Sequence, residues 1–230
     1  MAASPPPSPA RATRERSSGG EGLEEEQLVL VDEEDREVGT AGKLECHAGA
    51  GRLHRAFTAL ILDAESRLLL ARRSAPKMLW PGVWDATFAS HPRPGEGYVA
   101  AAQRRMPDEL GVSCEMEYLF KFVYRAGYLD VGTENEVCAT LVGTLKGGAA
   151  PAPAAAEISE VSWAGPRELA RRVRDDASAY CPWMLAAIWL VGEAPHPDVL
   201  DPWAEADIRE AARAGVRAHM GDSAWRMVGA

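Results

Sequence analysis

The sequence has little of the chemistry that marks secreted, membrane-spanning or nucleic-acid-binding proteins. Its four cysteines are scattered without a CxxC pair, which excludes a zinc ribbon and a disulfide framework and favours the reducing cytoplasm. No apolar run approaches the ~18 residues of a membrane span, and a signal-peptide core is missing. Bases are outnumbered by acids, 25 to 34, for a formal charge of -9, which argues against a nucleic-acid partner. We therefore expect a cytoplasmic protein without a membrane span.

The negative charge is concentrated near the front of the chain. Residues 21–37 contain nine acids and one base, Arg36, so the rest of the chain is nearly neutral and can carry a local basic site. Residues 1–20 are rich in Ser and Pro, although their Arg, Ser and Ala also resemble an organellar transit peptide. Because large apolar side chains are almost missing there, we interpret residues 1–27 as a disordered segment outside the fold.

The expected elements mix strands with helices. Apolar and β-branched runs predict strands at 28–31, 57–62, 67–73, 118–124 and 137–145, and the polar turn 63–66 joins two of them as a hairpin. Early prolines, a closing glycine and apolar periodicity predict helices at 97–110, 166–173, 182–191 and 203–220. The first of these helices should kink at Pro107. Without a regular βαβ alternation, the fold class is α+β. We expect one domain over 28–192, with a helical extension, 193–230, packed on it.

Histidines and acids suggest a metal site. Three of the five histidines, His47, His54 and His91, flank the expected hairpin. Glu134 and Glu136 share one face if they begin a strand. Three imidazoles and two carboxylates form a mixed donor set for Mn²⁺, Zn²⁺ or Mg²⁺. The alternative, from spacing alone, is a set of solvated surface groups.

A second group of residues is basic and aromatic. Lys43 precedes His47, Arg73 and Lys77 lie near a strand end, and Arg105 lies on the first expected helix. Bidentate Arg and point-charge Lys groups from different elements suit a diphosphate, although such bases are often only solvated. Nearby tryptophans are normally core residues, but their faces can also stabilise a carbocation.

Four stretches, in this order along the chain, resemble type I isopentenyl-diphosphate isomerase. They are HAGAGRLHRAF (47–57), RRSAPKMLWPGVWDATFASHP (72–92), YRAGYLDVGTENEVC (124–138) and CPWM (181–184). The resemblance implies a Nudix-like sandwich of mixed β-sheet and helices, with a prenyl diphosphate as substrate. It implies that one divalent metal is held by His47, His54, His91, Glu134 and Glu136. It also implies a second ion, Mg²⁺, between the diphosphate and Glu109, and diphosphate contacts from Lys43, Arg73, Lys77 and Arg105.

Nudix hydrolysis itself is not expected from this chain. The hydrolase helix follows the pattern REUxEExGU, whereas residues 104–112 read RRMPDELGV. The Arg-Glu pair and one Glu of that pattern are missing. The resemblance therefore implies isomerisation of isopentenyl diphosphate to dimethylallyl diphosphate, with the diphosphate retained.

The family's mechanism places an acid or base on each face of the substrate. The residues that match its Glu, Tyr and carbocation-facing Trp are Glu136, Tyr124 and Trp183. Its cysteine corresponds to Ala89, whose methyl group cannot transfer a proton. We expect Asp85 to replace it, because a buried carboxyl can act as an acid; Ser90 and a water molecule are the alternatives.

Two other activities remain open at this point. Glu136 with Tyr124, the proton-donating half of this machinery, would by itself suit a terpene cyclase that acts on a longer prenyl diphosphate. The second alternative is a non-catalytic protein that binds prenyl diphosphate and metal. The presence of all five metal ligands argues against it, because folding alone does not require them. The sequence does not specify the oligomeric state.

Overall fold

The computed structural model describes residues 26–147, 149–221 and 225–228, so the expected disordered segment lies almost wholly outside the described residues. Its strands are β1 (Gln27–Val31), β2 (Glu37–Gly42), β3 (His54–Leu62), β4 (Leu68–Arg73), β5 (Trp84–Asp85), β6 (Phe88–Ser90), β7 (Met116–Tyr128), β8 (Gly132–Thr144), β9 (Ile158–Ala164) and β10 (Trp225–Val228). Its α-helices are α1 (Lys43–His47), α2 (Tyr98–Leu110), α3 (Pro166–Asp175), α4 (Pro182–Leu190) and α5 (Ala206–Met220). Short 3₁₀ turns occupy Ala177–Ala179, Val191–Glu193 and Asp198–Trp203.

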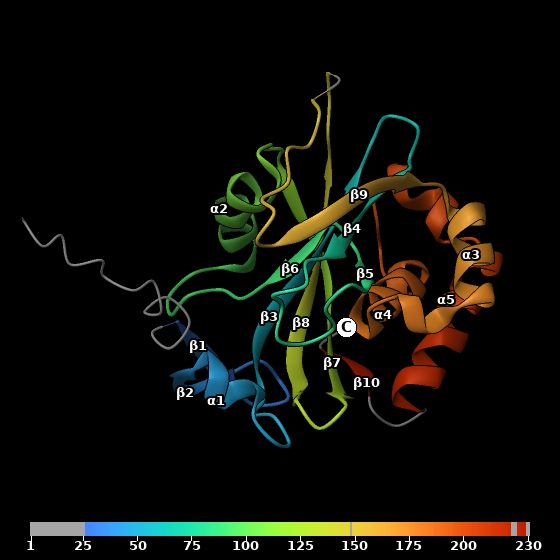
Figure 1. Cartoon of the computed structure of the whole chain (residues 1–230). Helices are drawn as coiled ribbons and strands as arrows, with labels where there is room; N and C mark the ends of the chain where they lie inside the picture. Colours follow the sequence, from blue (N-terminus) through green and yellow to red (C-terminus); the bar gives the residue numbers. More distant parts are fainter. Residues whose placement is uncertain (1–25, 148, 222–224, 229–230) are drawn as a thin grey trace, which may run out of the picture.

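The strands form one mixed sheet between two layers of helices (Figure 1). The main path of the sheet runs β10-β7-β8-β3-β1-β2, while β4 and β6 also pair with β3, and β9 pairs with β4. β3 and β8 run parallel, and the other pairs of described strands are antiparallel. Helix α2 lies on one side of the sheet, and α3, α4 and α5 lie on the other (Figure 1). This confirms the expected α+β class.

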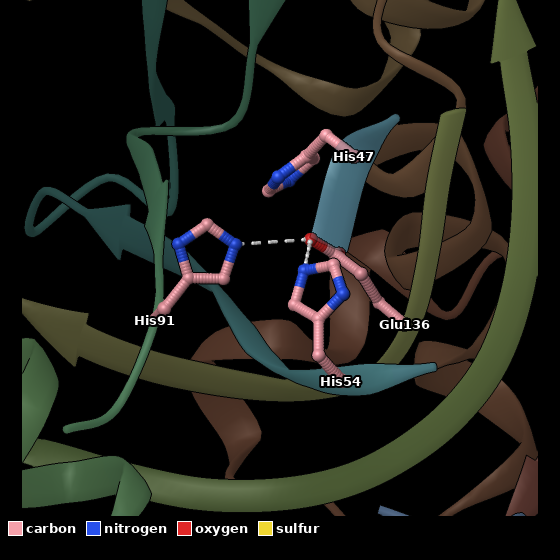
Figure 2. Close-up of side chains that lie close together, drawn as sticks. All are labelled: His47, His54, His91 and Glu136. Carbon is pink, nitrogen blue, oxygen red and sulfur yellow. Dashed lines mark hydrogen bonds and ion pairs between the residues drawn. The ribbon is translucent and has the colours of Figure 1, made fainter. Parts of the chain in front are cut away.

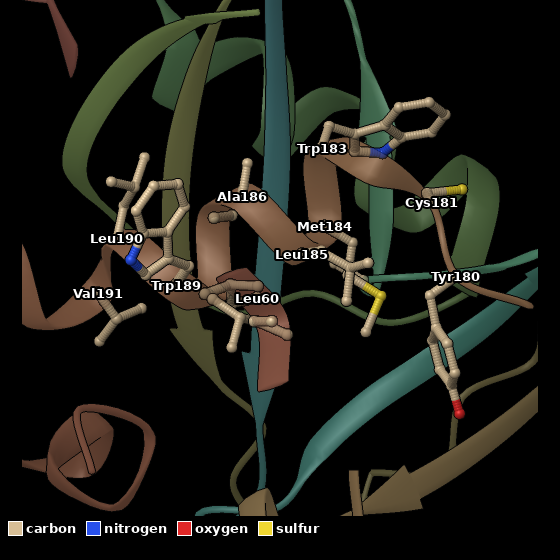
Figure 3. Packing of buried hydrophobic residues seen from close by; sticks show 14 of the residues in the cluster. Leu60, Tyr180, Cys181, Trp183, Met184, Leu185, Ala186, Trp189, Leu190 and Val191 are labelled. Carbon is tan, nitrogen blue, oxygen red and sulfur yellow. The ribbon is translucent and has the colours of Figure 1, made fainter. Parts of the chain in front are cut away.

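The core has two parts because side chains of a central strand alternate between the faces of the sheet. Phe57 and Ile61 of β3 pack in the cluster that contains α2, whereas Leu60 and Leu62 pack with α3, α4 and α5. Every residue of α4 is buried, and Figure 3 shows its side chains packed near Leu60. The continuous apolar run in β3 is therefore the pattern of a strand covered on both faces.

The expected strands are all present, but their pairing differs from a simple hairpin. β3 and β4 share only the antiparallel pair Leu62–Leu68. Beyond it, β3 pairs with β8 over its whole length and β4 pairs with β9. The sequence patterns missed β2, α1, β5, β6, β9 and β10, which are short or strongly polar. Helix α2 continues through Pro107 to Leu110, because the proline lies in its last turn and removes only one hydrogen bond.

The C-terminal region departs from the single helix expected over 203–220. A 3₁₀ turn ends at Trp203, Glu205 is extended, and α5 begins at Ala206. Trp203 and α5 contribute to the same core cluster as α4. The extension is also not wholly helical, since β10 pairs with β7. None of the helices in the described part of the chain is long and apolar enough to cross a membrane.

The glycine that ends α2 should tolerate a side chain less well than a glycine in an open loop. Gly111 closes the helix with φ 65°, and a Cβ there would lie 3.0 Å from the Ala152 carbonyl oxygen. Gly147 has a similar φ of 71° with nothing within 4 Å of a Cβ. We expect Gly147→Ala to lower the free energy of unfolding by about 1 kcal/mol and Gly111→Ala by about 2–3 kcal/mol, since only the latter adds a clash. Equal losses in chemical denaturation would contradict this.

Candidate active site

Four donor side chains meet at one end of the β3–β8 pair (Figure 2). One ligand atom from each of His47, His54, His91 and Glu136 lies within 4.8 Å of the others, and all four residues are buried. His54 and Glu136 are direct neighbours in the parallel register. His47 ends α1, and His91 follows β6. The set therefore comes from two neighbouring strands, from α1 and from the segment that follows β6.

The hydrogen bonds of these donors fit a bound cation. Nδ1 of His47 donates to the Lys43 carbonyl at 2.7 Å, and Nδ1 of His54 donates to the Arg52 carbonyl at 2.8 Å. Each neutral ring then presents the lone pair of Nε2, and that of His54 faces Glu136 Oε1 at 3.4 Å. His54 Nε2 and His91 Nδ1 have no hydrogen-bond partner. Lone pairs turned toward carboxylate oxygens are unfavourable unless a positive charge lies between them.

Glu134 lies beside the four donors rather than among them. Its Oε2 is 2.9 Å from His47 Nε2. Since Nδ1 of that ring carries the donated hydrogen, the neutral ring has no hydrogen to offer, and Glu134 Oε2 is without a hydrogen bond. The five residues expected as ligands are thus gathered together, and divalent metals with mixed nitrogen and oxygen preference fit them.

The imidazole and carboxylate groups of this cluster shift one another's pKa. Without a cation the His47 ring is held in its protonated form instead: burial would lower its pKa, but the Glu134 carboxylate beside Nε2 outweighs burial and raises the pKa to about 9. Burial lowers the pKa of His91 well below its usual value. Burial opposes ionisation of Glu136, yet the neighbouring His54 ring and the hydrogen bond from Tyr124 lower its pKa. The cluster therefore favours ionised carboxylates surrounded by positive charge.

Tyr124 and Trp183 lie on the same side of the sheet as Glu136. The Tyr124 hydroxyl donates to Glu136 Oε2 at 2.6 Å, and the two residues pair across β7 and β8. Burial raises the pKa of Tyr124 well above its usual value. The ring of Trp183, in the first turn of α4, lies 6.2 Å from that of Tyr124. An acid-base pair and an aromatic face thus adjoin the donors.

One cavity of about 1010 Å³ contains these groups and the expected basic residues. Its lining includes Lys43, Arg73, Lys77 and Arg105, and also His47, His91, Glu109, Tyr124, Glu134, Glu136 and Trp183. Glu109 is buried and accepts a hydrogen bond from Arg105 at 2.8 Å. Bases from four regions of the chain therefore converge on one space, beside the carboxylate expected to contact Mg²⁺.

Ala89 lines this cavity, but Asp85 does not. Asp85 is buried behind the wall, where its Oδ1 accepts from Trp183 Nε1 at 2.8 Å and its Oδ2 accepts from Arg73 Nη1 at 3.3 Å. It shares with Ala89 a smaller space of about 10 Å³, which is about the room that one water needs. Asp85 is thus next to Ala89 without direct access to the main cavity.

Two acids at this site were missed by the sequence reasoning. Glu26 pairs with Lys43 at 2.8 Å, and Glu157, in the loop before β9, pairs with Lys77 and Arg105. Glu26 was hidden in the acidic run, although its neighbour Gln27 pairs with Gly42 next to Lys43. Glu157 follows an Ala-Pro loop without a motif, so no local signal identifies it.

Asp85 should make stability depend on pH. Burial, opposed by Arg73 and Trp183, raises the pKa of Asp85 from 3.8 to about 6. The folded protein therefore binds this proton more tightly, and the associated stability is complete below about pH 4 and lost as the pH rises through about 6. The difference between the Asp85 pKa in the unfolded chain, 3.8, and in the folded protein, about 6, corresponds to about 3 kcal/mol of unfolding free energy. Asp85→Asn lacks this proton, so its stability should not follow the same pH dependence. In urea titrations, its unfolding free energy relative to that of the wild type should therefore rise by up to about 3 kcal/mol between pH 4 and 7. A constant difference would contradict this.

The chain is similar to a known domain family and to curated proteins that share one name. The NUDIX domain family matches residues 52–184. Among curated proteins, "Isopentenyl-diphosphate Delta-isomerase 1" of Aromatoleum aromaticum is 40% identical over 164 residues, covering 71% of this chain and 91% of that protein. "Isopentenyl-diphosphate Delta-isomerase" of Nocardia farcinica is 38% identical over 170 residues, covering 74% and 95%. Haloarcula marismortui has a protein of the same name that is 38% identical, covering 71% and 89%.

Among solved structures, DR0079 from Deinococcus radiodurans superimposes with a TM-score of 0.58 at 23% identity, covering 70% of this chain and 97% of that one. This likeness concerns the fold alone. The family match over more than half of the chain, together with the extent and level of identity to the curated proteins, shows that this chain belongs to the NUDIX domain family and, within it, to the isopentenyl-diphosphate Delta-isomerase family.

Proposed function

We propose that this protein converts isopentenyl diphosphate to dimethylallyl diphosphate with the aid of divalent cations. The observation that supports this best is the single cavity lined by His/Glu donors, by the Glu136–Tyr124 pair and by four bases. The names of the curated relatives point to the same reaction. Cytoplasmic location and the lack of a nucleic-acid partner remain predictions from composition.

The reaction moves one double bond and leaves the diphosphate intact. A proton added to the terminal methylene carbon creates a tertiary cation. Loss of a proton from the CH2 group on the other side of the cationic carbon, toward the diphosphate, forms the new double bond. The Glu136–Tyr124 pair would supply the first proton, since it holds a hydrogen between two buried oxygens 2.6 Å apart at the cavity. The face of Trp183 would stabilise the cation.

Different residues would bind the two ions and the substrate. A divalent cation among His47, His54, His91, Glu134 and Glu136, for which Mn²⁺, Zn²⁺ and Mg²⁺ are all suitable, would supply the positive charge that the buried carboxylates require. Glu109 would contact the Mg²⁺ that accompanies the diphosphate. Lys43, Arg73, Lys77 and Arg105 would orient the phosphate oxygens.

The group that completes proton transfer on the other face is also a proposal. Ala89 lines the cavity, and Asp85 lies behind it across a space of about one water molecule. Asp85 would then act through that water, because its own oxygens contact Arg73 and Trp183. Ser90, which lines the main cavity, is the alternative.

A second candidate is protonation-initiated cyclisation of a longer prenyl diphosphate. The observation in its favour is the cavity volume of about 1010 Å³, at the upper end of the roughly 300–1,000 Å³ typical of pockets for much larger ligands than a five-carbon chain. Its wall carries a methyl group at Ala89 in place of a thiol, which leaves additional room.

One experiment separates these activities. The protein is incubated in deuterated water with Mg²⁺ and Mn²⁺ and with isopentenyl, geranyl, farnesyl or geranylgeranyl diphosphate, and the products are read by mass spectrometry. Deuterated dimethylallyl diphosphate is the expected product. A deuterated cyclic product would establish the cyclase instead, and no label from any substrate would leave a non-catalytic prenyl-diphosphate-binding protein.

Restoring a thiol should increase isomerase activity. Ala89 pairs with Thr58 across β3 and β6 and lines the cavity, so Ala89→Cys places a proton-transfer group directly at the substrate. We expect a rise in kcat of about tenfold or more, within the roughly 10²–10⁴-fold range of general acid-base catalysis. Ala89→Ser, which fills similar space with a much weaker acid, is the matched control. Equal rates for both variants would contradict the assignment of this position.

A further inference from the structure

Each base expected to contact the diphosphate already has a carboxylate partner. Lys43 pairs with Glu26 at 2.8 Å, and Arg73 pairs with Asp85 at 3.3 Å. Lys77 pairs with Glu157. Arg105 pairs with Glu157 and Glu109, and more distantly with Asp108 at 4.0 Å. The basic wall of the cavity is therefore nearly neutral before any ligand arrives, although a cluster of bases alone would attract any polyanion.

Glu157 differs from the other partners in its position. Its Oε2 pairs with Lys77 and its Oε1 lies 3.3 Å from Arg105 Nη2, so one carboxylate bridges two of the bases. The side chain lines the main cavity and remains 29% exposed, whereas Asp85 lies buried outside it. A phosphate group that contacts both Lys77 and Arg105 must therefore approach the Glu157 carboxylate closely.

The two forms of the ligand meet this carboxylate differently. Metal-free diphosphate brings only negative charge, and its oxygens are repelled by Glu157 while competing with it for the same two bases. Diphosphate that carries a divalent cation brings less net charge and a positive centre that favours a nearby carboxylate. Glu109, on the same guanidinium, adds to this effect at 2.8 Å from Arg105.

We propose that Glu157 makes this site selective for diphosphate that carries its divalent cation over metal-free diphosphate. This rests on the proposed function, because it assumes that diphosphate binds to Lys77 and Arg105. Glu157 is thus a specificity residue, which acts through the charge it places between two bases and transfers no proton. The selectivity excludes unproductive binding of the substrate without its ion.

The test uses inorganic diphosphate as the probe and isothermal titration calorimetry as the readout, so no turnover is involved. Kd is measured for the wild type, Glu157→Gln and Glu157→Ala, once with excess Mg²⁺ and once with a chelator. The ratio of the two Kd values reports selectivity for the metal-bound form. Because chelation also removes an ion from the His/Glu donors, ratios are compared between proteins in identical buffers.

The matched control is Glu160→Gln. Glu160 lies three residues further on, in β9, pairs with Arg72 at 3.6 Å and does not line the cavity. We expect both Glu157 variants to bind metal-free diphosphate about tenfold or more tightly than the wild type, as removal of one nearby like charge implies. Their Kd ratios should shrink accordingly, and Glu160→Gln should keep the wild-type ratio.

Two results would overturn the inference, and they are distinguishable. If the wild type binds diphosphate with Mg²⁺ but the Glu157 variants keep its Kd ratio, the selectivity does not come from Glu157 and the proposed function is unaffected. If the wild type binds diphosphate in neither buffer, the diphosphate site itself is wrong, and the proposed function fails with the inference. Unchanged melting temperatures establish that the variants are folded.

Discussion

Glu136→Gln should reduce deuterium uptake from the solvent by about 10³-fold or more, whichever prenyl diphosphate is the substrate. Glu136 accepts the hydrogen bond of Tyr124 at 2.6 Å and also lies 3.3–3.4 Å from the nearest nitrogens of His91 and His54. An amide keeps the shape of the side chain but removes both its proton transfer and its negative charge. Loss of label would be measured by mass spectrometry of the product.

Glu117→Gln is the control for this substitution. Glu117 is an exposed carboxylate on the same strand as Tyr124, so its loss changes charge near the site's supporting strand without touching the cavity. It should retain the wild-type rate. Uptake by Glu136→Gln within tenfold of the wild type would show that another group donates the proton.

Removing divalent cations should destabilise the protein as well as stop turnover. A ligand present at 100 times its Kd contributes about 2.7 kcal/mol to the folded state. For a chain of 230 residues, this corresponds to a fall in Tm of about 5–10 °C on chelation. The physical reason is that the buried carboxylates and the nitrogen lone pairs of His47 and His54 lose the positive charge between them.

This effect should depend on the donors themselves. In Glu136→Gln, one of the four clustered donors is lost, so the chelator should change Tm much less than in the wild type. Re-addition of Mn²⁺ or Zn²⁺ to the chelated wild type should restore the Tm that it had before chelation. If chelation lowers Tm equally in the wild type and in Glu136→Gln, the ion that stabilises the fold binds elsewhere.

Several parts of the site could be predicted because they depend on local patterns. The spacing of Glu134 and Glu136 requires only the two-residue period of a strand, and both residues lie in β8. The histidines were grouped by residue type and by their places beside one hairpin. The strand pairing was less accessible. β3 pairs with β8 over its whole length and with β4 only at Leu62–Leu68, and a strand pattern does not specify its neighbour.

Asp85 illustrates the limit of residue chemistry. Its carboxyl type and its place near Ala89 pointed to an acid at the substrate. Its neighbours in space, Arg73 and Trp183, place it behind the cavity wall instead. A space of about 10 Å³ separates it from Ala89, and no sequence pattern describes such a space.

The sequence by itself determined the types of chemistry available: five possible metal donors, four bases, a possible acid-base pair and the methyl group of Ala89. It also determined the α+β class through apolar periodicity, which is a local property of the chain. Only the tertiary structure decided which charges neutralise one another. Lys77 and Glu157 are separated by 80 positions, and their contact arises because β4 pairs with β9. Contacts of this kind depend on the packing of the whole sheet, so the near-neutral charge of the diphosphate wall could not be read from the sequence.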